Sequence, residues 1–427
     1  MLKKLDIIII GAGVAGVTAA VSARKQKPQA KIAILSHEVY PAYSKPSLPY
    51  VISRSVAFNE IVIYPPEDLK ARNIQLLSGF EVYSINPKER ILRARAVNGV
   101  KEIVFAYNTL ILATGGNEVV PLIKGAELGN VFTMRTFEDA LKISKSVKPG
   151  KPAVVVGAGP IGLSTAQALN ARGMKTIMVI RSRILRALLE PDLSLILQER
   201  AKIAGIKTII GAEVEEIGGF RIVEYVKVPN KKISASMVIF ALGVRPSVKL
   251  AKEAHIDLGR YGGIKVDEHM RTSNDEIFAA GDCIEITDLI TGKPTYVPVG
   301  SIAAETGRIA GVNAAGGNEK SEGFIRIQGD NFFGLDVTSI GHSSATASTL
   351  GIKASVSDVH PQSIFKDVKH FFKKYPVKVK IITDEKRRVI GAQTLGSKFM
   401  TMNRYALLQA IKEKMKIDEF LDSWKEP

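Results

Sequence analysis

The hydrophobic pattern of the chain contains one unit twice. In each copy a run of consecutive apolar residues predicts a buried strand, which leads into a glycine-rich turn and then into a helix-like segment. The apolar runs are residues 7–10 and 153–156, and the turns that follow begin at Gly11 and Gly157, 146 positions apart. The pattern therefore predicts two strand–turn–helix units separated by about the length of a domain.

Both turns have the spacing GxGxxG. At the start of a helix, the first glycine allows a tight turn, the second lets the backbone approach a pyrophosphate, and the third permits close packing of helix on strand. Two copies in this context indicate two dinucleotides in one chain, usually a flavin and a nicotinamide. The candidate residues are Gly11, Gly13, Val14, Ala15 and Gly16 in the first turn, and Gly157, Gly159, Pro160, Ile161 and Gly162 in the second.

Three later segments repeat the pattern of an apolar strand that ends in glycine. Residues 109–116 suit a crossover between domains, and residues 240–246 precede the expected return of the chain. Residues 272–282 place an acid after a short strand, where it can accept a hydrogen bond from a ribityl hydroxyl while backbone amides meet phosphate. These segments add Ala113, Thr114, Gly115, Gly243, Gly281 and Asp282 to the candidate cofactor-binding residues.

The composition limits the class of protein. The 427 residues favour two to four domains, and 46% hydrophobic with 24% charged residues is ordinary for a globular protein. A single cysteine excludes an internal disulfide and fits a reducing cytoplasm, and the six histidines show no metal-ligand spacing. No uninterrupted apolar stretch is long enough to predict a membrane span.

The formal charge of +17 has two interpretations. One is a lysine-rich surface of the kind found in thermophile proteins. The other is attraction to anionic partners such as dinucleotide phosphates, coenzyme A or an acidic electron carrier. No nucleic-acid-binding motif accompanies the charge, so no nucleic acid is expected as a partner.

As a set, these motifs resemble the two-dinucleotide-binding flavoproteins, the pyridine nucleotide–disulfide oxidoreductases, and in particular the branch of NADH oxidases, coenzyme A disulfide reductases and rubredoxin or nitrite reductases. The resemblance covers almost the whole chain. It implies an α/β fold with two Rossmann-like domains of the three-layer ββα flavoprotein type and a C-terminal α/β dimerisation domain, and hence a homodimer. The implied boundaries are 1–113 with 244–320 for FAD, 114–243 for NAD(P)H, and 321–427 for dimerisation.

The resemblance also assigns roles to residues. It implies that the first turn and Asp282 bind FAD, that the second turn holds the nicotinamide cofactor, and that a helix start meets the pyrimidine edge of the flavin. That helix start involves Val299, Gly300 and Ala303. Glu38 is the candidate that holds the adenosine ribose, although it lies slightly late in register and has the alternative of a plain loop acid.

The specificity for the nicotinamide cofactor depends on the end of the strand at residues 175–180. The acid that would hold a free ribose 2′-hydroxyl is expected near Ile180, and this position and its successors offer arginines instead. Guanidinium groups of Arg181 and Arg183 pair well with a 2′-phosphate, so NADPH is expected to be preferred or at least accepted. The alternative is a surface arginine cluster.

The loop at residues 41–50 departs from the family. Many relatives carry a reactive cysteine at the position of Pro46, and many carry a glutamate at the position of Ser164. Lys45-Pro46 instead resembles the basic–proline pair of rubredoxin and nitrite reductase relatives, whose flavin passes electrons directly outward. We therefore expect Lys45, Pro46 and Tyr50 to line the flavin and shape how electrons leave, with ordinary loop packing as the alternative for Tyr50. The resemblance also implies an aromatic, proline-rich tail, where this sequence has the residues DEFLDSWKEP; Trp424 is expected either to take the role of that tail or to be a terminal packing residue.

The expected activity is hydride transfer from NAD(P)H to FAD. Four alternatives stay open for the protein's function. It is an oxidase that passes electrons to dioxygen or a quinone-type acceptor, or a reductase of a small redox protein such as rubredoxin or ferredoxin. Otherwise it is a reductase of coenzyme A disulfide or sulfur with an atypical site, or a non-catalytic flavoprotein that responds to NAD(P)H. Cys283, the only cysteine, follows Asp282 and is expected to be a buried packing residue, so thiol-based disulfide reduction is disfavoured.

Overall fold

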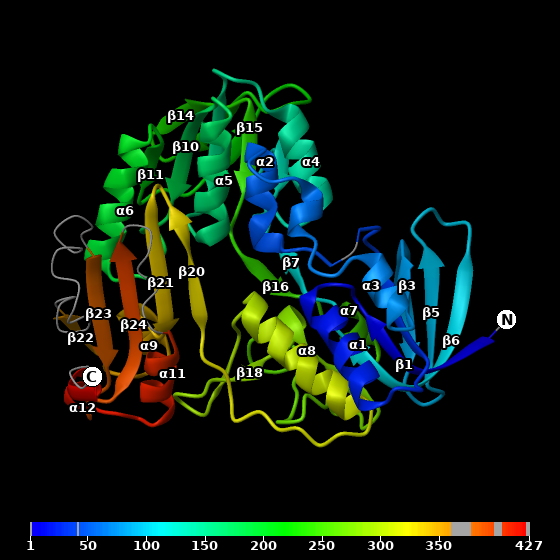
Figure 1. Cartoon of the computed structure of the whole chain (residues 1–427). Helices are drawn as coiled ribbons and strands as arrows, with labels where there is room; N and C mark the ends of the chain where they lie inside the picture. Colours follow the sequence, from blue (N-terminus) through cyan, green and yellow to red (C-terminus); the bar gives the residue numbers. More distant parts are fainter. Residues whose placement is uncertain (1, 41, 360–376, 397–403, 424–427) are drawn as a thin grey trace. The chain divides into compact units, whose positions relative to one another are not determined.

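The computed structural model describes residues 2–40, 42–359, 377–396 and 404–423. Trp424, considered above as a terminal aromatic, lies outside these residues. The chain divides into two compact units (Figure 1), each of which collects distant segments of the sequence. Unit 1 is Met1–Ser47, Val56–Asn117 and Val244–Phe324, and unit 2 is Leu48–Ser55, Glu118–Gly243 and Ile325–Pro427.

Unit 1 is built on a seven-stranded sheet in the order β3-β2-β1-β6-β5-β4, with β17 also paired to β6. Strands β1, β2, β3, β6 and β17 pair in parallel, as buried strands joined by helical crossovers do. The strands are β1 (Leu2–Ile10), β2 (Ile32–Ser36), β3 (Ile74–Ser78), β4 (Phe80–Asn86), β5 (Ile91–Ala96), β6 (Glu102–Leu112) and β17 (Ile277–Ala279).

Strand β6 joins the parallel and the antiparallel parts of this sheet. Its first half pairs antiparallel with β5, from Ile91 opposite Ala106, and its last three residues pair in parallel with β17. The antiparallel branch β4–β5–β6 thus continues the parallel part of the same sheet. This arrangement brings the carboxyl ends of β1, β6 and β17 to one edge, where the turns after them meet.

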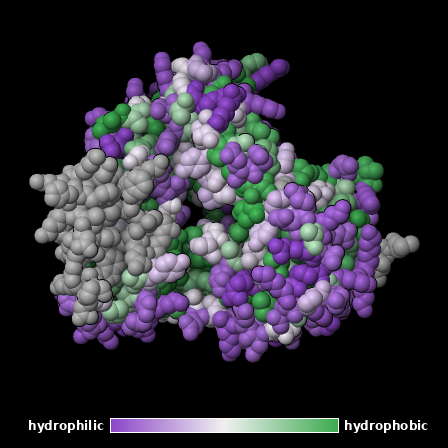
Figure 2. Space-filling view, in the orientation of Figure 1, coloured by the Kyte–Doolittle hydropathy of each residue, from purple (hydrophilic) through white to green (hydrophobic). Residues whose placement is uncertain are grey.

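Helices α1 (Val14–Gln26) and α8 (Gly300–Ala314) pack against each other in unit 1. A Cβ atom on Gly307 would lie 2.3 Å from the Ala15 carbonyl oxygen, and one on Gly311 would lie 2.1 Å from the Ala19 carbonyl oxygen. The small residues therefore allow the two backbones to touch. In Figure 2 the viewed surface around these helices is mostly hydrophilic, whereas the strand residues Ile7–Ile10 beneath are at most 6% exposed.

The remaining elements of unit 1 are short. They comprise η1 (Lys45–Ser47), η2 (Phe58–Ile61), α3 (Pro66–Ala71), β16 (Val244–Pro246), α7 (Lys249–Glu253), η3 (Gly281–Cys283), β18 (Ile286–Thr287) and β19 (Pro294–Thr295). Strand β7 (Gly116–Glu118) lies where the chain leaves unit 1 for unit 2.

Unit 2 contains a second parallel sheet in the order β11-β10-β9-β15-β8. Its strands are β8 (Val131–Thr133), β9 (Pro152–Val156), β10 (Lys175–Ile180), β11 (Lys207–Ile210) and β15 (Met237–Phe240). The helices with them are α4 (Phe137–Ser146), α5 (Pro160–Ala171) and α6 (Pro191–Ile203), and a small antiparallel sheet follows, β12 (Glu216–Gly218), β13 (Tyr225–Val228) and β14 (Lys231–Ser234). Helix α2 (Leu48–Ser53) ends 78 positions before β8, the first strand of this sheet in the sequence, yet it packs on α4 and α5.

The last part of unit 2 is an antiparallel sheet in the order β20-β21-β24-β23-β22. Helix α11 packs on β21 and β24. The elements are β20 (Ile327–Phe332), β21 (Leu335–Gly341), α9 (Ser344–Thr349), β22 (Ser355–Val359), β23 (Val377–Thr383), β24 (Val389–Gly396), α11 (Arg404–Lys412) and α12 (Ile417–Ser423).

The α/β class and the strand–turn–helix order of both repeats are confirmed: β1 leads into α1, and β9 leads into α5. The domain boundaries and the dimerising role of the C-terminal part stay predictions. Among the residues that the structure describes, no helix has the length and apolar character needed to cross a membrane.

Candidate functional site

The first glycine turn joins β1 to α1 in unit 1. Gly11 has a φ of +110°, and a Cβ atom there would lie 2.1 Å from the Ala113 carbonyl oxygen. A Cβ atom on Gly16 would lie 1.9 Å from the Gly11 carbonyl oxygen, whereas one on Gly13 would meet nothing within 4 Å. The outer glycines are therefore required by packing inside the protein, and the middle glycine faces open space.

The second turn, between β9 and α5 in unit 2, has the same geometry. Gly157 has a φ of +109°, and its Cβ atom would lie 2.4 Å from the Ala241 carbonyl oxygen. The third glycine, Gly162, would clash with the Gly157 carbonyl oxygen at 2.5 Å, and Gly159 again has no atom within 4 Å of its Cβ position. The sequence repeat is thus a repeat of local structure.

The chemistry of both turns suits a phosphate group. Gly13 and Gly159 are the N-cap residues of α1 and α5, neither provides a side-chain cap, and neither helix has an acid in its first turn. The first backbone N–H groups of each helix therefore have no side-chain acceptor, and the positive end of the helix dipole faces the open space before the middle glycine. A dinucleotide pyrophosphate fits these two places, because it brings negative charge and needs a close approach to the backbone.

Two more predicted segments of unit 1 lie beside the first turn. Gly281, in η3, has a φ of +81°, its N–H donates to Thr306 Oγ1 at 3.0 Å, and its Cβ position is 2.8 Å from the Ala15 Cβ atom. The N-terminus of α8 at Val299 also has no side-chain cap, and a Cβ on Gly300 would meet nothing within 4 Å. The structure thus brings the start of α1, the acid-bearing η3 and the start of α8 together, and their contacts with the flavin stay a prediction.

Three other candidate residues hold the crossover strands in place. The Thr114 hydroxyl donates to the Ser247 carbonyl at 2.7 Å, and the Ala113 N–H donates to the Ile10 carbonyl at 2.9 Å. Gly115 accepts from the Ser247 N–H at 2.9 Å. The first and third of these bonds tie the end of β6 to the segment after β16, and the second ties it to β1, all inside unit 1.

Glu38 lies two residues after β2 and is held by two neighbours. Its carboxylate accepts a 2.9 Å hydrogen bond from Lys45 Nζ and one from the Tyr43 hydroxyl, and the Tyr43 ring packs edge-on against Phe58. Burial by itself would raise the pKa of the Glu38 carboxyl, but the Lys45 ammonium and the Tyr43 hydroxyl outweigh it, so the pKa lies below its ordinary value. Lys45 is therefore engaged with Glu38, a pairing that links the ribose candidate to the loop at residues 41–50.

The Lys45→Met variant is expected to lower the free energy of unfolding by about 1 kcal/mol at neutral pH, because it leaves a largely buried carboxylate without its cation. A carboxylate with a lowered folded-state pKa contributes stability above its ordinary pKa of 4.5, and this is lost as the pH falls through the folded-state value. The difference between variant and wild type, measured by thermal unfolding of the FAD-loaded protein, should therefore shrink below pH 4.5. Lys45→Arg should behave like wild type, and an equal loss at all pH values would contradict the ion-pair explanation.

The three residues expected to shape electron transfer are placed differently. Lys45 and Pro46 lie in η1, which is part of unit 1, whereas Tyr50 lies in α2, which is part of unit 2. The Tyr50 hydroxyl donates to Asp330 Oδ1 on β20 at 2.8 Å, and burial together with Asp330 raises the Tyr50 pKa. Tyr50 therefore stays protonated and fixes α2 to the C-terminal sheet. The contact between Tyr50 and Asp330 could not be predicted from a local sequence pattern, because the two residues are 280 positions apart.

The two arginines after β10 have different surroundings. The Arg181 side chain is 75% exposed and lies 3.6 Å from the equally accessible Glu213 carboxylate. Arg183 turns inward: its Nη1 donates to the Leu189 carbonyl and, at 3.0 Å, to the Ser194 hydroxyl, and burial lowers its pKa. Arg181 is thus available to a ligand, whereas one nitrogen of Arg183 serves the loop before α6.

Cys283 and Ser164 are both buried, at 0% and 7% exposure. Burial raises the pKa of the Cys283 thiol, which keeps it protonated and poorly nucleophilic. The described residues contain no cluster of histidine, cysteine, aspartate or glutamate able to hold a metal ion.

Comparison with known proteins agrees with this geometry. The family model described as pyridine nucleotide-disulphide oxidoreductase matches residues 5–307. An NADH oxidase of Methanocaldococcus jannaschii is 34% identical over 417 residues, which are 96% of this chain and 92% of that protein. An NADH-rubredoxin oxidoreductase of Clostridium acetobutylicum is 29% identical and covers 74% of this chain and 76% of its own length. The solved structure of an NAD-dependent persulfide reductase from A. fulgidus superimposes with a TM-score of 0.89 at 28% identity, over 97% of this chain and 78% of that one.

Proposed function

The chain belongs to the pyridine nucleotide-disulphide oxidoreductase family and is an NAD(P)H oxidoreductase, and on this premise we propose that its reduced flavin passes electrons directly to dioxygen or to a quinone-type acceptor. The cofactors are FAD, bound by the turn at Gly11–Gly16, and NAD(P)H, bound by the turn at Gly157–Gly162. With dioxygen the reaction converts NAD(P)H, one proton and O2 to NAD(P)+ and hydrogen peroxide.

The observation that carries the proposal is the lack of a usable thiol. Position 46 is proline, and the only cysteine, Cys283, is 0% exposed with a raised pKa. A thiol relay needs a thiolate that can reach its substrate. Because both glycine turns keep the geometry that a dinucleotide requires, reduction of the flavin does not depend on that thiol.

The protein's part in the reaction is to bind and orient. When bound, the nicotinamide and the flavin supply the redox chemistry, a hydride transfer between them. The N-termini of α1 and α5 would hold the two pyrophosphates, and Asp282 in η3 would accept a hydrogen bond from the ribityl chain. Lys45 and Pro46 keep the loop beside the flavin rigid, because proline fixes its own φ and restricts the residue before it.

A second candidate is reduction of a small acidic redox protein. The net charge of +17 favours it, since opposite charges steer association and raise its rate. A rubredoxin reductase is also among the similar proteins. Both candidates share the first half of the reaction and differ only in the acceptor.

The test is a two-stage rapid-mixing experiment with the FAD-loaded protein. We expect NADPH, added without oxygen, to bleach the flavin absorbance, and subsequent mixing with dioxygen or a quinone to restore it within the turnover time. Reoxidation that requires rubredoxin or ferredoxin would replace the first candidate by the second.

Two further outcomes would contradict both candidates. Reoxidation by coenzyme A disulfide alone would indicate a sulfur reductase, and a long-lived reduced complex with every acceptor would indicate a protein that senses NAD(P)H. Treatment with iodoacetamide serves as the control, because buried Cys283 should stay unmodified and activity should persist.

A further inference from the structure

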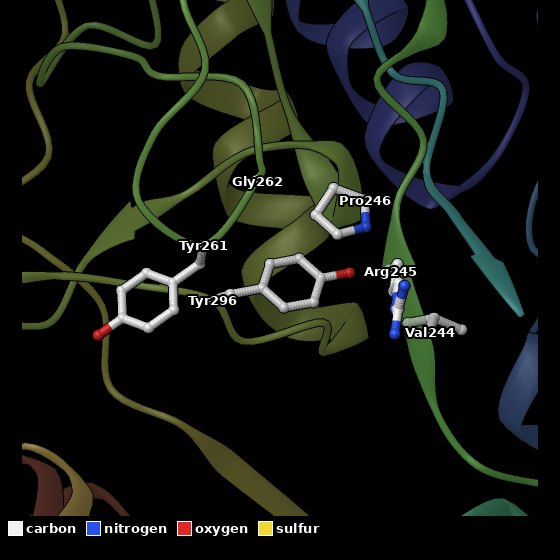
Figure 3. Close-up of a pocket in the computed structure, with 6 residues that line it drawn as sticks. All are labelled: Val244, Arg245, Pro246, Tyr261, Gly262 and Tyr296. Atoms are coloured by element: carbon white, nitrogen blue, oxygen red, sulfur yellow. The ribbon is translucent and has the colours of Figure 1, made fainter. Parts of the chain in front are cut away.

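A cavity of about 420 Å³ lies within unit 1. Its lining consists of β16, a turn before η3 and the residue Tyr296 ahead of α8 (Figure 3). In this view Tyr296 lies between Tyr261 and β16, and its hydroxyl points toward the Arg245 and Pro246 side. The volume is in the range of sites that hold small organic molecules.

The turn that carries Tyr261 is held in place by the side chain of Glu285. The buried carboxylate of Glu285 accepts hydrogen bonds from the Tyr261 N–H and, at 3.3 Å, from the Gly263 N–H. The Gly259 N–H also donates to the Gly263 carbonyl at 2.8 Å, and a Cβ on either of these glycines would collide with Glu285. The Tyr261 ring, 43% exposed, is therefore presented by a preformed turn rather than by a loose loop.

The wall of the cavity formed by Tyr296, opposite Tyr261, contacts the region assigned to the flavin. The Tyr296 hydroxyl donates to the Asp282 carbonyl at 3.1 Å, and Asp282 is the residue expected to hold the ribityl chain. Gly116 keeps this wall close, because its Cβ position lies 3.0 Å from the Arg245 carbonyl oxygen and 3.4 Å from the Tyr296 hydroxyl oxygen. A molecule in the cavity would therefore be separated from the ribityl site by the side chain of Tyr296 and the backbone of η3.

The polar character of the cavity is cationic and aromatic. The Arg245 side chain is exposed and has no ion-pair or hydrogen-bond partner among the described residues. The Arg260 guanidinium is not part of the lining but lies 5.9 Å from the centre of the Tyr261 ring. No acid is among the lining residues. The two tyrosine rings offer flat faces, and a guanidinium without a side-chain partner pairs with a carbonyl or anionic oxygen.

We propose that this cavity, lined by Arg245, Tyr261 and Tyr296, is the site that binds the electron acceptor, and that the acceptor is a planar quinone, preferably one with an anionic substituent. The proposal rests on the proposed function, because it names a substrate class for the second half of the reaction. The overall step is balanced: NADPH, one proton and the quinone give NADP+ and the hydroquinone. The two electrons come from NADPH, and the second proton of the hydroquinone comes from solvent.

The test compares two quinone probes, a naphthoquinone sulfonate and the neutral quinone menadione, with FAD-loaded protein and NADPH. Arg245→Gln should raise the KM for the sulfonate about tenfold, the loss expected for one charge-assisted contact, and leave the KM for menadione within about twofold. Tyr261→Leu should raise both. Arg93→Gln, an exposed arginine on β5, is the matched control and should change neither.

Readouts on the flavin separate this proposal from the proposed function. FAD content and anaerobic reduction by NADPH should be unchanged in Arg245→Gln, and a loss of FAD would instead make the cavity part of the flavin site and overturn the proposal. Equal KM values for the sulfonate in Arg245→Gln and wild type would also overturn it. If wild type is not reduced by NADPH, the proposed function fails, and equilibrium dialysis of the sulfonate with the oxidised protein still decides whether Arg245 binds it.

Discussion

Gly13→Val is expected to give a folded protein that has lost at least about nine-tenths of its FAD and, with it, NAD(P)H oxidation. The backbone at Gly13 has φ −71° and ψ 178°, which any residue adopts, and a Cβ there meets no protein atom within 4 Å. The added methyl groups would instead occupy the space into which the pyrophosphate approaches the α1 N-terminus. The measurement is the ratio of flavin absorbance to protein absorbance after purification, together with circular dichroism.

Gly159→Val provides the matched variant in the second turn, with φ −74° and ψ 178° and again no neighbour within 4 Å. It should keep its FAD, remain reducible by dithionite, and no longer be reduced by NADPH. The pair therefore assigns one dinucleotide to each turn. Retention of FAD in Gly13→Val, or loss of FAD in Gly159→Val, would contradict the assignment. If either variant loses its helical circular dichroism signal, it has not folded and says nothing about binding. Gly13→Ala and Gly159→Ala, which have smaller side chains, then decide the assignment.

The second large effect concerns the choice between NADPH and NADH. Arg181→Glu is expected to lower kcat/KM for NADPH about 100-fold while leaving that for NADH unchanged or improved, because a cation that pairs with the 2′-phosphate becomes an anion that repels it. Arg181 is suited to this role because it is 75% exposed and its contact with exposed Glu213, at 3.6 Å, is weak. The measurement is steady-state kinetics with both cofactors at fixed ionic strength.

Glu213→Gln is the control for Arg181, since it frees the guanidinium without removing it. It should leave kcat/KM for NADPH unchanged or slightly raised. Arg183→Gln should mainly lower thermal stability, because Arg183 Nη1 binds the Leu189 carbonyl and the Ser194 hydroxyl. Better kinetics of the wild type with NADH than with NADPH would refute the cofactor preference itself.

Much of the fold could be predicted from the sequence because its signals are local. A buried strand, a GxGxxG turn and a helix follow one another within about twenty residues, and both predicted units are present, with the outer glycines where a Cβ would collide with backbone. The same strand-then-glycine pattern singled out Asp282, and the family resemblance associated it with the first turn. These features depend on steric limits that act between neighbours in the chain.

Contacts between distant residues could not be predicted in this way. Tyr50 and Asp330 are 280 positions apart, and their hydrogen bond shows that α2 packs with unit 2 although Lys45, five residues earlier, belongs to unit 1. Arg181 and Arg183 look alike in the sequence, yet one faces solvent and the other binds a carbonyl. No sequence motif indicates that Glu285 accepts a hydrogen bond from the backbone of the Tyr261 turn.

By itself, then, the sequence determined that the chain folds into two dinucleotide-type turns and that it has no cysteine at position 46. Only the tertiary structure decided which charges are free, which carboxylates are already paired, and where a cavity remains. The physical reason is that glycine geometry and strand periodicity arise from the local backbone, whereas the availability of a side chain depends on every group that the fold brings within a few ångströms of it.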